Sequence, residues 1–186
     1  MNYIPEGSDV GLGRRRWLVR AAFAVSGLTL ASTPRAGGRD EGISRSAESI
    51  HQEVSFNASP ARIYAVLTDA ALFQRLELFS EARKSLDMEA HPARISRDPG
   101  GAFSLFSDYI SGRQIELVPD QRIVQAWRVG NWAPGSYSLA RFDLVAQGGG
   151  TRLVFDHTGF PVGDAEHLAA GWYGNYWEPL RKVLAA

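Results

Sequence analysis

A run of short, turn-separated segments in the second half of the chain most constrains its fold. The segments are rich in aromatic and β-branched residues and cover positions 102–110, 113–118, 122–129, 136–145 and 151–158. Between them lie Ser111-Gly112, Pro119-Asp120, Ala133-Pro134-Gly135 and Gly148-Gly149-Gly150, which are typical of turns. Connections this short join antiparallel neighbours, because a parallel pair needs a crossover of a dozen or more residues. The pattern therefore predicts an antiparallel meander.

A further strand and a helix are predicted before the meander. Residues 50–56 alternate apolar and polar side chains, which indicates a half-buried strand. Ser59-Pro60 marks the start of a helix, because serine can cap free backbone amides and proline suits the first helical position. One apolar face of this helix runs from Ile63 to Ala71. The charged residues that follow allow a second short helix over 76–86.

A long amphipathic helix is predicted at the end of the chain, with Asp164 as its cap. Its apolar face carries Leu168, Trp172, Tyr176, Leu180 and Val183. Gly171 and Gly174 fall on the opposite face. About 20 residues make a helix roughly 30 Å long, which matches the width of about six strands. Pro179 predicts a bend, because it cannot donate to the carbonyl of Asn175.

The order of these elements is that of the helix-grip fold, an α+β fold in which a curved antiparallel sheet of six to seven strands wraps the last helix. Residues 101–132, 148–161 and 171–184 resemble three ordered motifs of the C-terminal domain of the activator of heat-shock protein 90 ATPase. That family belongs to the START-like (SRPBCC) superfamily, and the resemblance covers residues 49–186. It implies a cavity between sheet and helix, which other members of the superfamily use for lipids, sterols, polyketides and other apolar ligands.

The first part of the chain differs from this domain in charge. Residues 1–36 hold five arginines against two acidic residues, a net charge of +3, which leaves −3 on the rest of a formally neutral chain. The arginines precede an apolar run at 21–31 that is too short to span a bilayer. This layout predicts a signal peptide and its cleavage region at 1–36, a flexible spacer at 37–48 and one domain at 49–186. The alternative is a misassigned start codon that adds a basic tail.

The residues Arg14-Arg15-Arg16-Trp17-Leu18 resemble the twin-arginine export signal, and Thr29-Leu30-Ala31 is the most natural cleavage site. We therefore expect contact with the export machinery and a periplasmic mature protein, or a cytoplasmic one if the start is misassigned. No stable membrane span is expected. The chain has no cysteine, which excludes a lipoprotein anchor and disulfides.

Catalytic and metal-binding patterns are not evident in the sequence. The four histidines lack HExxH spacing and cysteine is absent, so we assign no metal and no cofactor. Asp156 and His157 are adjacent in a predicted strand, so they face opposite sides and cannot form a direct dyad. His157 shares its face with Leu153 and Phe155 and is expected to point inward, either as a satisfied core histidine or as a polar group in the cavity.

Large aromatic rings are dense in the domain. Core packing explains each ring taken singly, but a curved sheet and a bulky helix seldom fill the space between them. We therefore predict six cavity-lining residues: Trp127, Trp172, Tyr176, His157, Phe106 and Tyr109. Asp108 and Arg128 would form an internal acid and base only if their strand faces turn inward.

Three functions are consistent with these features. The leading one is non-enzymatic binding of an apolar small molecule or lipid. The second is a chaperone-activator module, which the family resemblance implies. The third is a polyketide cyclase or dehydratase, which requires an inward general base such as His157. A nucleic-acid partner is not expected, because the chain has no net positive charge and its predicted domain is acidic.

Overall fold

The computed structural model describes residues 48–87 and 89–186. The predicted leader, all but the last residue of the predicted spacer, and Met88 lie outside these residues. The elements follow in the order β1 (Ser49–Phe56), α1 (Pro60–Thr68), α2 (Ala70–Glu77), η1 (Glu81–Lys84), β2 (Arg94–Ile95), β3 (Ala102–Leu105), β4 (Ile110–Val118), β5 (Arg122–Val129), β6 (Ser138–Gln147), β7 (Gly150–Thr158), α3 (Ala165–Trp172), η2 (Tyr173–Trp177) and α4 (Glu178–Ala185).

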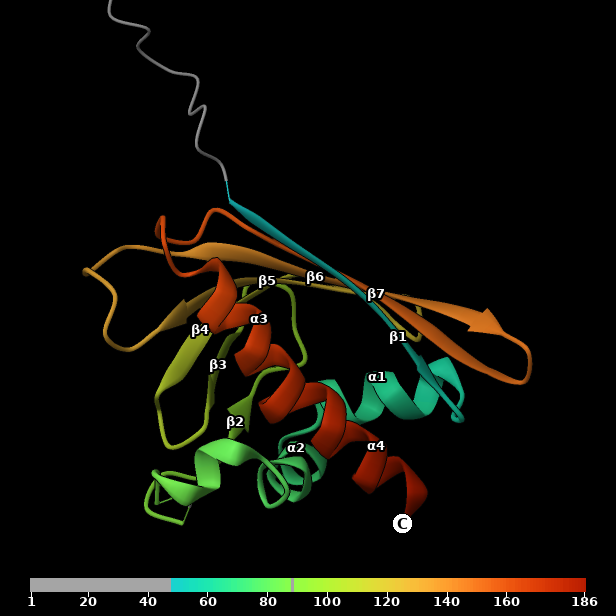
Figure 1. Ribbon diagram of the computed structural model, residues 1–186. Coiled ribbons are helices and arrows are strands. Elements are labelled where there is room, and N and C mark those ends of the chain that lie inside the picture. Colours follow the sequence, from blue (N-terminus) through green and yellow to red (C-terminus); the bar gives the residue numbers. More distant parts are fainter. Residues whose placement is uncertain (1–47, 88) are drawn as a thin grey trace, which may run out of the picture. The chain divides into compact units, whose positions relative to one another are not determined.

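The strands form one antiparallel sheet in the order β1-β7-β6-β5-β4-β3-β2. The first strand pairs with the last over its whole length, from Ser49 opposite Thr158 to Phe56 opposite Thr151. Figure 1 shows the sheet curving over the continuous helix formed by α3, η2 and α4, with α1 and α2 near the C-terminal end of that helix. The predicted α+β helix-grip fold is confirmed. Among the described residues, no helix combines the length and the apolar character needed to cross a membrane.

The hairpin between β3 and β4 turns earlier than the sequence pattern predicts. Its turn comprises residues 106–109, and Phe106, Ser107 and Asp108 have φ angles of 51°, 55° and 64°. The prediction of a turn at Ser111-Gly112 is wrong, because Gly112 lies within β4, opposite Phe103. A Cβ atom at Gly112 would overlap the carbonyl oxygen of Ala126 and the Phe103 ring. This glycine therefore serves close packing in a strand rather than a turn.

The predicted cap of the first helix is confirmed, since the Ser59 hydroxyl accepts a 3.4 Å hydrogen bond from the amide of Arg62. The helix ends sooner than its apolar pattern suggests. Asp69 interrupts it and caps α2, because its carboxylate accepts 3.0 Å hydrogen bonds from the amides of Ala71 and Leu72. Two short helices therefore replace one longer helix.

The charged stretch after α2 contains the single turn η1, so the helix expected over 76–86 is wrong in its bounds. The amide of Ala82 donates a 2.8 Å hydrogen bond to the side-chain oxygen of Asn175. Gly174 is buried, and a Cβ atom there would lie 2.7 Å from the carboxyl carbon of Glu81. The face of the last helix that we expected to be its back is therefore covered here by η1, which can approach closely because residue 174 has no side chain.

The last helix changes its winding in the middle. The segment η2 is π-helical, and Pro179 follows it in the first turn of α4. The amide of Glu178 donates to the carbonyl of Tyr173, five residues earlier, so the predicted irregularity lies just before Pro179. Asp164 precedes α3, but its carboxylate accepts a 2.9 Å hydrogen bond from the indole N–H of Trp132 instead of capping the helix.

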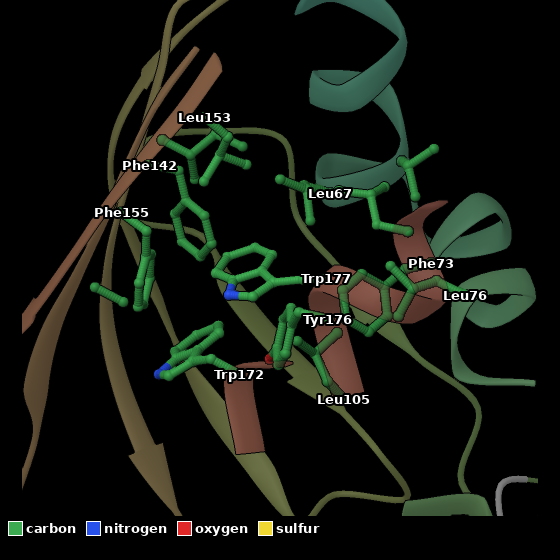
Figure 2. Packing of buried hydrophobic residues seen from close by; sticks show 14 of the residues in the cluster. Leu67, Phe73, Leu76, Leu105, Phe142, Leu153, Phe155, Trp172, Tyr176 and Trp177 are labelled. Atoms are coloured by element: carbon green, nitrogen blue, oxygen red, sulfur yellow. The ribbon is translucent and has the colours of Figure 1, made fainter. Parts of the chain in front are cut away.

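Aromatic side chains of this helix fill the concave side of the sheet. Figure 2 shows Trp172, Tyr176 and Trp177 between Phe142 and Phe155 of the sheet and the side chains of α1 and α2. The ring centroids of Phe155 and Trp172 are 4.4 Å apart, and those of Trp172 and Tyr176 are 4.3 Å apart. Burial of rings of this size is the main source of stability for such a core.

Candidate ligand-binding site

A cavity of about 520 Å³ lies beside the aromatic core. Its wall is formed by one face of α3 and η2, by β4 and β5 with their flanking turns, and by the segment 81–86. Five of the six predicted residues line it: Phe106, Tyr109, Trp127, Trp172 and Tyr176. The predictions missed the segment 81–86 and Trp132, because neither lies on a strand or helix whose pattern indicates an inward face.

The helical side of the cavity follows one stripe of residues. Asp164, Leu168, Gly171 and Asn175 recur at helical spacing and all line the cavity. From Asp164 to Asn175 the stripe extends about 16 Å. A Cβ atom at Gly171 would meet only the side-chain nitrogen of Asn175, at 4.0 Å. Our prediction that Gly171 lies on the back of the helix is therefore wrong, since the missing side chain adds room to the cavity.

Two buried polar atoms of the wall have no hydrogen-bond partner among the described residues: the indole nitrogen Nε1 of Trp127 and the hydroxyl of Tyr176. Burial raises the pKa of the Tyr176 hydroxyl, and Glu77 adds to this shift. The Trp127 indole N–H opposes the shift, because it approaches the hydroxyl oxygen, although without the geometry of a hydrogen bond. The hydroxyl therefore remains protonated at neutral pH. Leaving a buried donor unpaired costs about 1–3 kcal/mol, so this pair of donors needs an explanation.

His157 points inward, as its strand pattern predicts, but it is not among the cavity-lining residues. Its Nδ1 accepts a 3.0 Å hydrogen bond from the indole N–H of Trp172, and its Nε2 lies 2.7 Å from the hydroxyl of Ser138. That hydroxyl donates in turn to the carbonyl of Trp127 at 2.9 Å. Burial lowers the pKa of His157 to about 4. His157 is thus a neutral, fully bonded core histidine.

Glu77 is a buried acid that the sequence analysis did not single out. Its carboxylate accepts a 2.6 Å hydrogen bond from the amide of Phe106, in the left-handed turn that contributes to the cavity wall. Burial raises its pKa, and the bond from Phe106 partly opposes this. A signal for its burial was present, because Glu77 lies one helical turn after the buried Phe73.

The other acid–base candidates lie outside the cavity. Asp108 is partly exposed and pairs with Arg94 at 2.7 Å and His91 at 2.9 Å, and its pKa is lowered mainly by a hydrogen bond from Ser104. Arg128 donates to the carbonyl of Trp132. Within 48–87 and 89–186, no group of three metal-ligating side chains is close enough to hold an ion.

Asp156 and His157 do face opposite sides of the sheet, because Asp156 lies 2.7 Å from His51 on the partly exposed side. This contact is the main reason that the pKa of His51 is raised. The two residues therefore do not form a dyad.

A curved antiparallel sheet, a C-terminal helix across it and a cavity between them define a START-like helix-grip domain. The Activator of Hsp90 ATPase homolog 1-like family matches residues 57–185, and the chain belongs to this family. The predicted family resemblance is thereby confirmed.

Named relatives and solved structures agree with this assignment. The chain is 28% identical over 135 residues to the mouse activator of 90 kDa heat shock protein ATPase homolog 2, covering 73% of this chain and 37% of the mouse protein. It is 28% identical over 130 residues to the human homolog 1, covering 70% of this chain and 35% of the human protein. The chain thus spans little more than a third of these relatives' length.

A crystal structure of an HSP90 activator from Plasmodium falciparum superposes with a TM-score of 0.63 at 25% identity, covering 74% of this chain and 96% of that one. CalU16 from Micromonospora echinospora superposes with a TM-score of 0.59 at 19% identity, covering 75% of this chain and 77% of CalU16. The second similarity is one of fold alone.

Proposed function

We propose that this domain binds an apolar small molecule in the cavity between the sheet and the last helix, without catalysing a reaction on it. The observation that carries the proposal is the pair of unpaired donors, Trp127 and Tyr176, in an aromatic wall. The volume of about 520 Å³ lies in the range of ordinary small-molecule sites. A ligand oxygen placed near both donors would remove the free-energy cost of leaving them unpaired.

The rest of the wall suits an apolar ligand body. Phe106, Trp172 and Tyr176 supply ring surface, and Leu168 supplies aliphatic surface. A cyclase or dehydratase is not proposed, because both ring nitrogens of His157 already have partners and His157 does not line the cavity. The low pKa of His157 also makes it a poor proton acceptor at neutral pH.

Filling the cavity tests the proposal. In Gly171→Leu the new side chain would enter open space, so the protein should fold and lose ligand binding by at least about tenfold. Gly171→Ala is the matched control, because it removes the same glycine and leaves most of the volume free. Native mass spectrometry of the purified full-length chain, with copurified and added apolar ligands, measures binding. Unchanged binding by folded Gly171→Leu contradicts this site.

A second candidate function is activation of a chaperone ATPase, and membership of the family favours it. The mouse and human relatives are named as activators of the 90 kDa heat shock protein ATPase, over a length nearly three times that of the matched region. An ATPase assay with a bacterial chaperone of that class, with and without this protein, tests the idea. Absence of both stimulation and binding would remove it.

We further propose that residues 1–36 direct export and are removed. The support is the order of arginines at 14–16 and the apolar run at 21–31. N-terminal sequencing of the protein from periplasmic and cytoplasmic fractions tests this. Replacing both Arg14 and Arg15 with lysine should retain the uncleaved chain in the cytoplasm. An unprocessed cytoplasmic wild-type chain contradicts the proposal.

A further inference from the structure

The cavity wall carries two carboxylates and no lysine or arginine among the residues that the structure describes. The carboxylates belong to Glu81 and Asp164, and the imidazole of His167 also lies on the wall. An anionic ligand would therefore meet two carboxylates and no fixed positive charge.

Neither carboxylate is neutralised by a charged neighbour among the described residues. Neither Glu81 nor Asp164 forms an ion pair with another residue of the part of the chain that the structure describes. Asp164 is also oriented, because its Oδ2 accepts the 2.9 Å hydrogen bond from Trp132. A carboxylate at the edge of an apolar cavity interacts more strongly with a charge than one in bulk water, since the local dielectric constant is lower.

Aromatic rings on the cavity wall favour a ligand of the same sign of charge, and one of them contacts Asp164. Tyr109 is 40% exposed and lines the cavity, and Trp132 lines it beside Asp164. The face of an aromatic ring attracts a cation within about 6 Å of its centre. The unpaired donors of Trp127 and Tyr176 are an independent sign that the cavity accepts a ligand.

We infer that the cavity prefers an amphiphile with an apolar body and a cationic amine or ammonium head, held by Asp164 beside the ring of Trp132. Glu81 packs against Gly174, about 15 Å further along the last helix, and adds to the negative potential of the wall. This inference rests on the proposed ligand-binding function. Asp164 is the stronger determinant, because Trp132 holds its carboxylate in place.

Three probes of equal chain length test the preference: dodecylamine, dodecanol and dodecanoate, each below its critical micelle concentration. Binding to the full-length protein is followed by calorimetry and by the fluorescence of the wall tryptophans. We expect dodecylamine to bind about tenfold more tightly than dodecanol, and dodecanoate to bind about tenfold more weakly. Equal affinities would overturn the charge preference and leave ligand binding intact. Failure of all three to bind would overturn this inference, whereas the Gly171→Leu comparison tests the proposed function separately.

Substitutions that keep the side-chain shape and remove the charge show which carboxylate causes the preference for the amine. Asp164→Asn retains an acceptor for Trp132 and should reduce the amine-to-alcohol ratio from about tenfold to about twofold, and Glu81→Gln should reduce it less. Glu166→Gln is the matched control, because Glu166 is an exposed acid on α3 that does not line the cavity. A preference that survives both wall substitutions, or falls equally in Glu166→Gln, overturns the assignment to Asp164 and Glu81.

Discussion

Trp172 separates two polar environments inside this domain. On its sheet side, the indole N–H donates to His157, and Ser138 continues the chain of hydrogen bonds to the backbone of Trp127, so that each of these side chains is paired. On its cavity side, the Trp127 indole and the Tyr176 hydroxyl are buried and unpaired. The first arrangement joins three strands to a helix. The second is costly without a ligand, so the difference distinguishes groups that stabilise the fold from groups available for binding.

Among the substitutions that test this comparison, removal of Trp172 should lower the free energy of unfolding the most. Trp172→Ala deletes a fully buried ring that contacts both sides, and we expect it to lower the free energy of unfolding by about 3–5 kcal/mol. Urea unfolding followed by circular dichroism measures the loss. Tyr173→Ala is the control, because Tyr173 is 56% exposed and should change stability by less than about 0.5 kcal/mol. A loss below about 1 kcal/mol would show that Trp172 does not hold the two sides apart.

The paired side should lose stability in acid because of His157. Its pKa is lowered from 6.5 to about 4 by burial, so the neutral form is favoured in the folded state. The resulting stabilisation is fully present above pH 6.5 and is lost as the pH falls toward 4. A shift of this size corresponds to about 3 kcal/mol. Unfolding free energies of wild type and His157→Gln, measured from pH 7 to pH 4, isolate this contribution. Parallel pH profiles would contradict it.

The paired side also shows how far sequence reasoning reaches. Alternation along one strand suffices to turn His157 inward and Asp156 outward, because side chains of a strand point to opposite faces. Its partners could not be predicted in the same way. Ser138 and Trp172 come from another strand and from the last helix, and only tertiary packing brings them to the two ring nitrogens.

On the cavity side, the sequence identifies the aromatic lining residues but not the segment 81–86. Five of the six predicted residues line the cavity, since inward periodicity and size identify large rings. The segment 81–86 was missed, because a short turn of charged residues has no hydrophobic period and its position depends on the contact of Ala82 with Asn175. The turn predicted at Gly112 is wrong because the sequence alone does not distinguish a turn glycine from a strand glycine. Only the fold shows that the Phe103 ring occupies the space of a side chain at residue 112.

Ser138→Ala should lower the free energy of unfolding moderately, because it disrupts the hydrogen bonds of the paired side. It removes the hydroxyl that lies between His157 and the carbonyl of Trp127, leaving buried polar groups without a partner. We expect a loss of about 1–3 kcal/mol in the free energy of unfolding. Ser136→Ala, in the loop before β6, is a control of the same chemistry with an expected change below about 0.5 kcal/mol. Equal effects of the two substitutions would mean that the network adds nothing to stability.

Tyr176→Phe should have the smallest effect on stability and is the most direct test of the unpaired side. Because the hydroxyl is buried without a partner, its removal from the ligand-free chain should be neutral or should stabilise the fold by up to about 1 kcal/mol. The same substitution should weaken binding of an oxygen-bearing apolar ligand by about fivefold, since one donor of the pair is lost. Thermal unfolding and ligand titration of the same preparation measure both quantities. Destabilisation by more than about 1 kcal/mol would show that the hydroxyl is paired within the fold, and the two sides of Trp172 would then no longer differ.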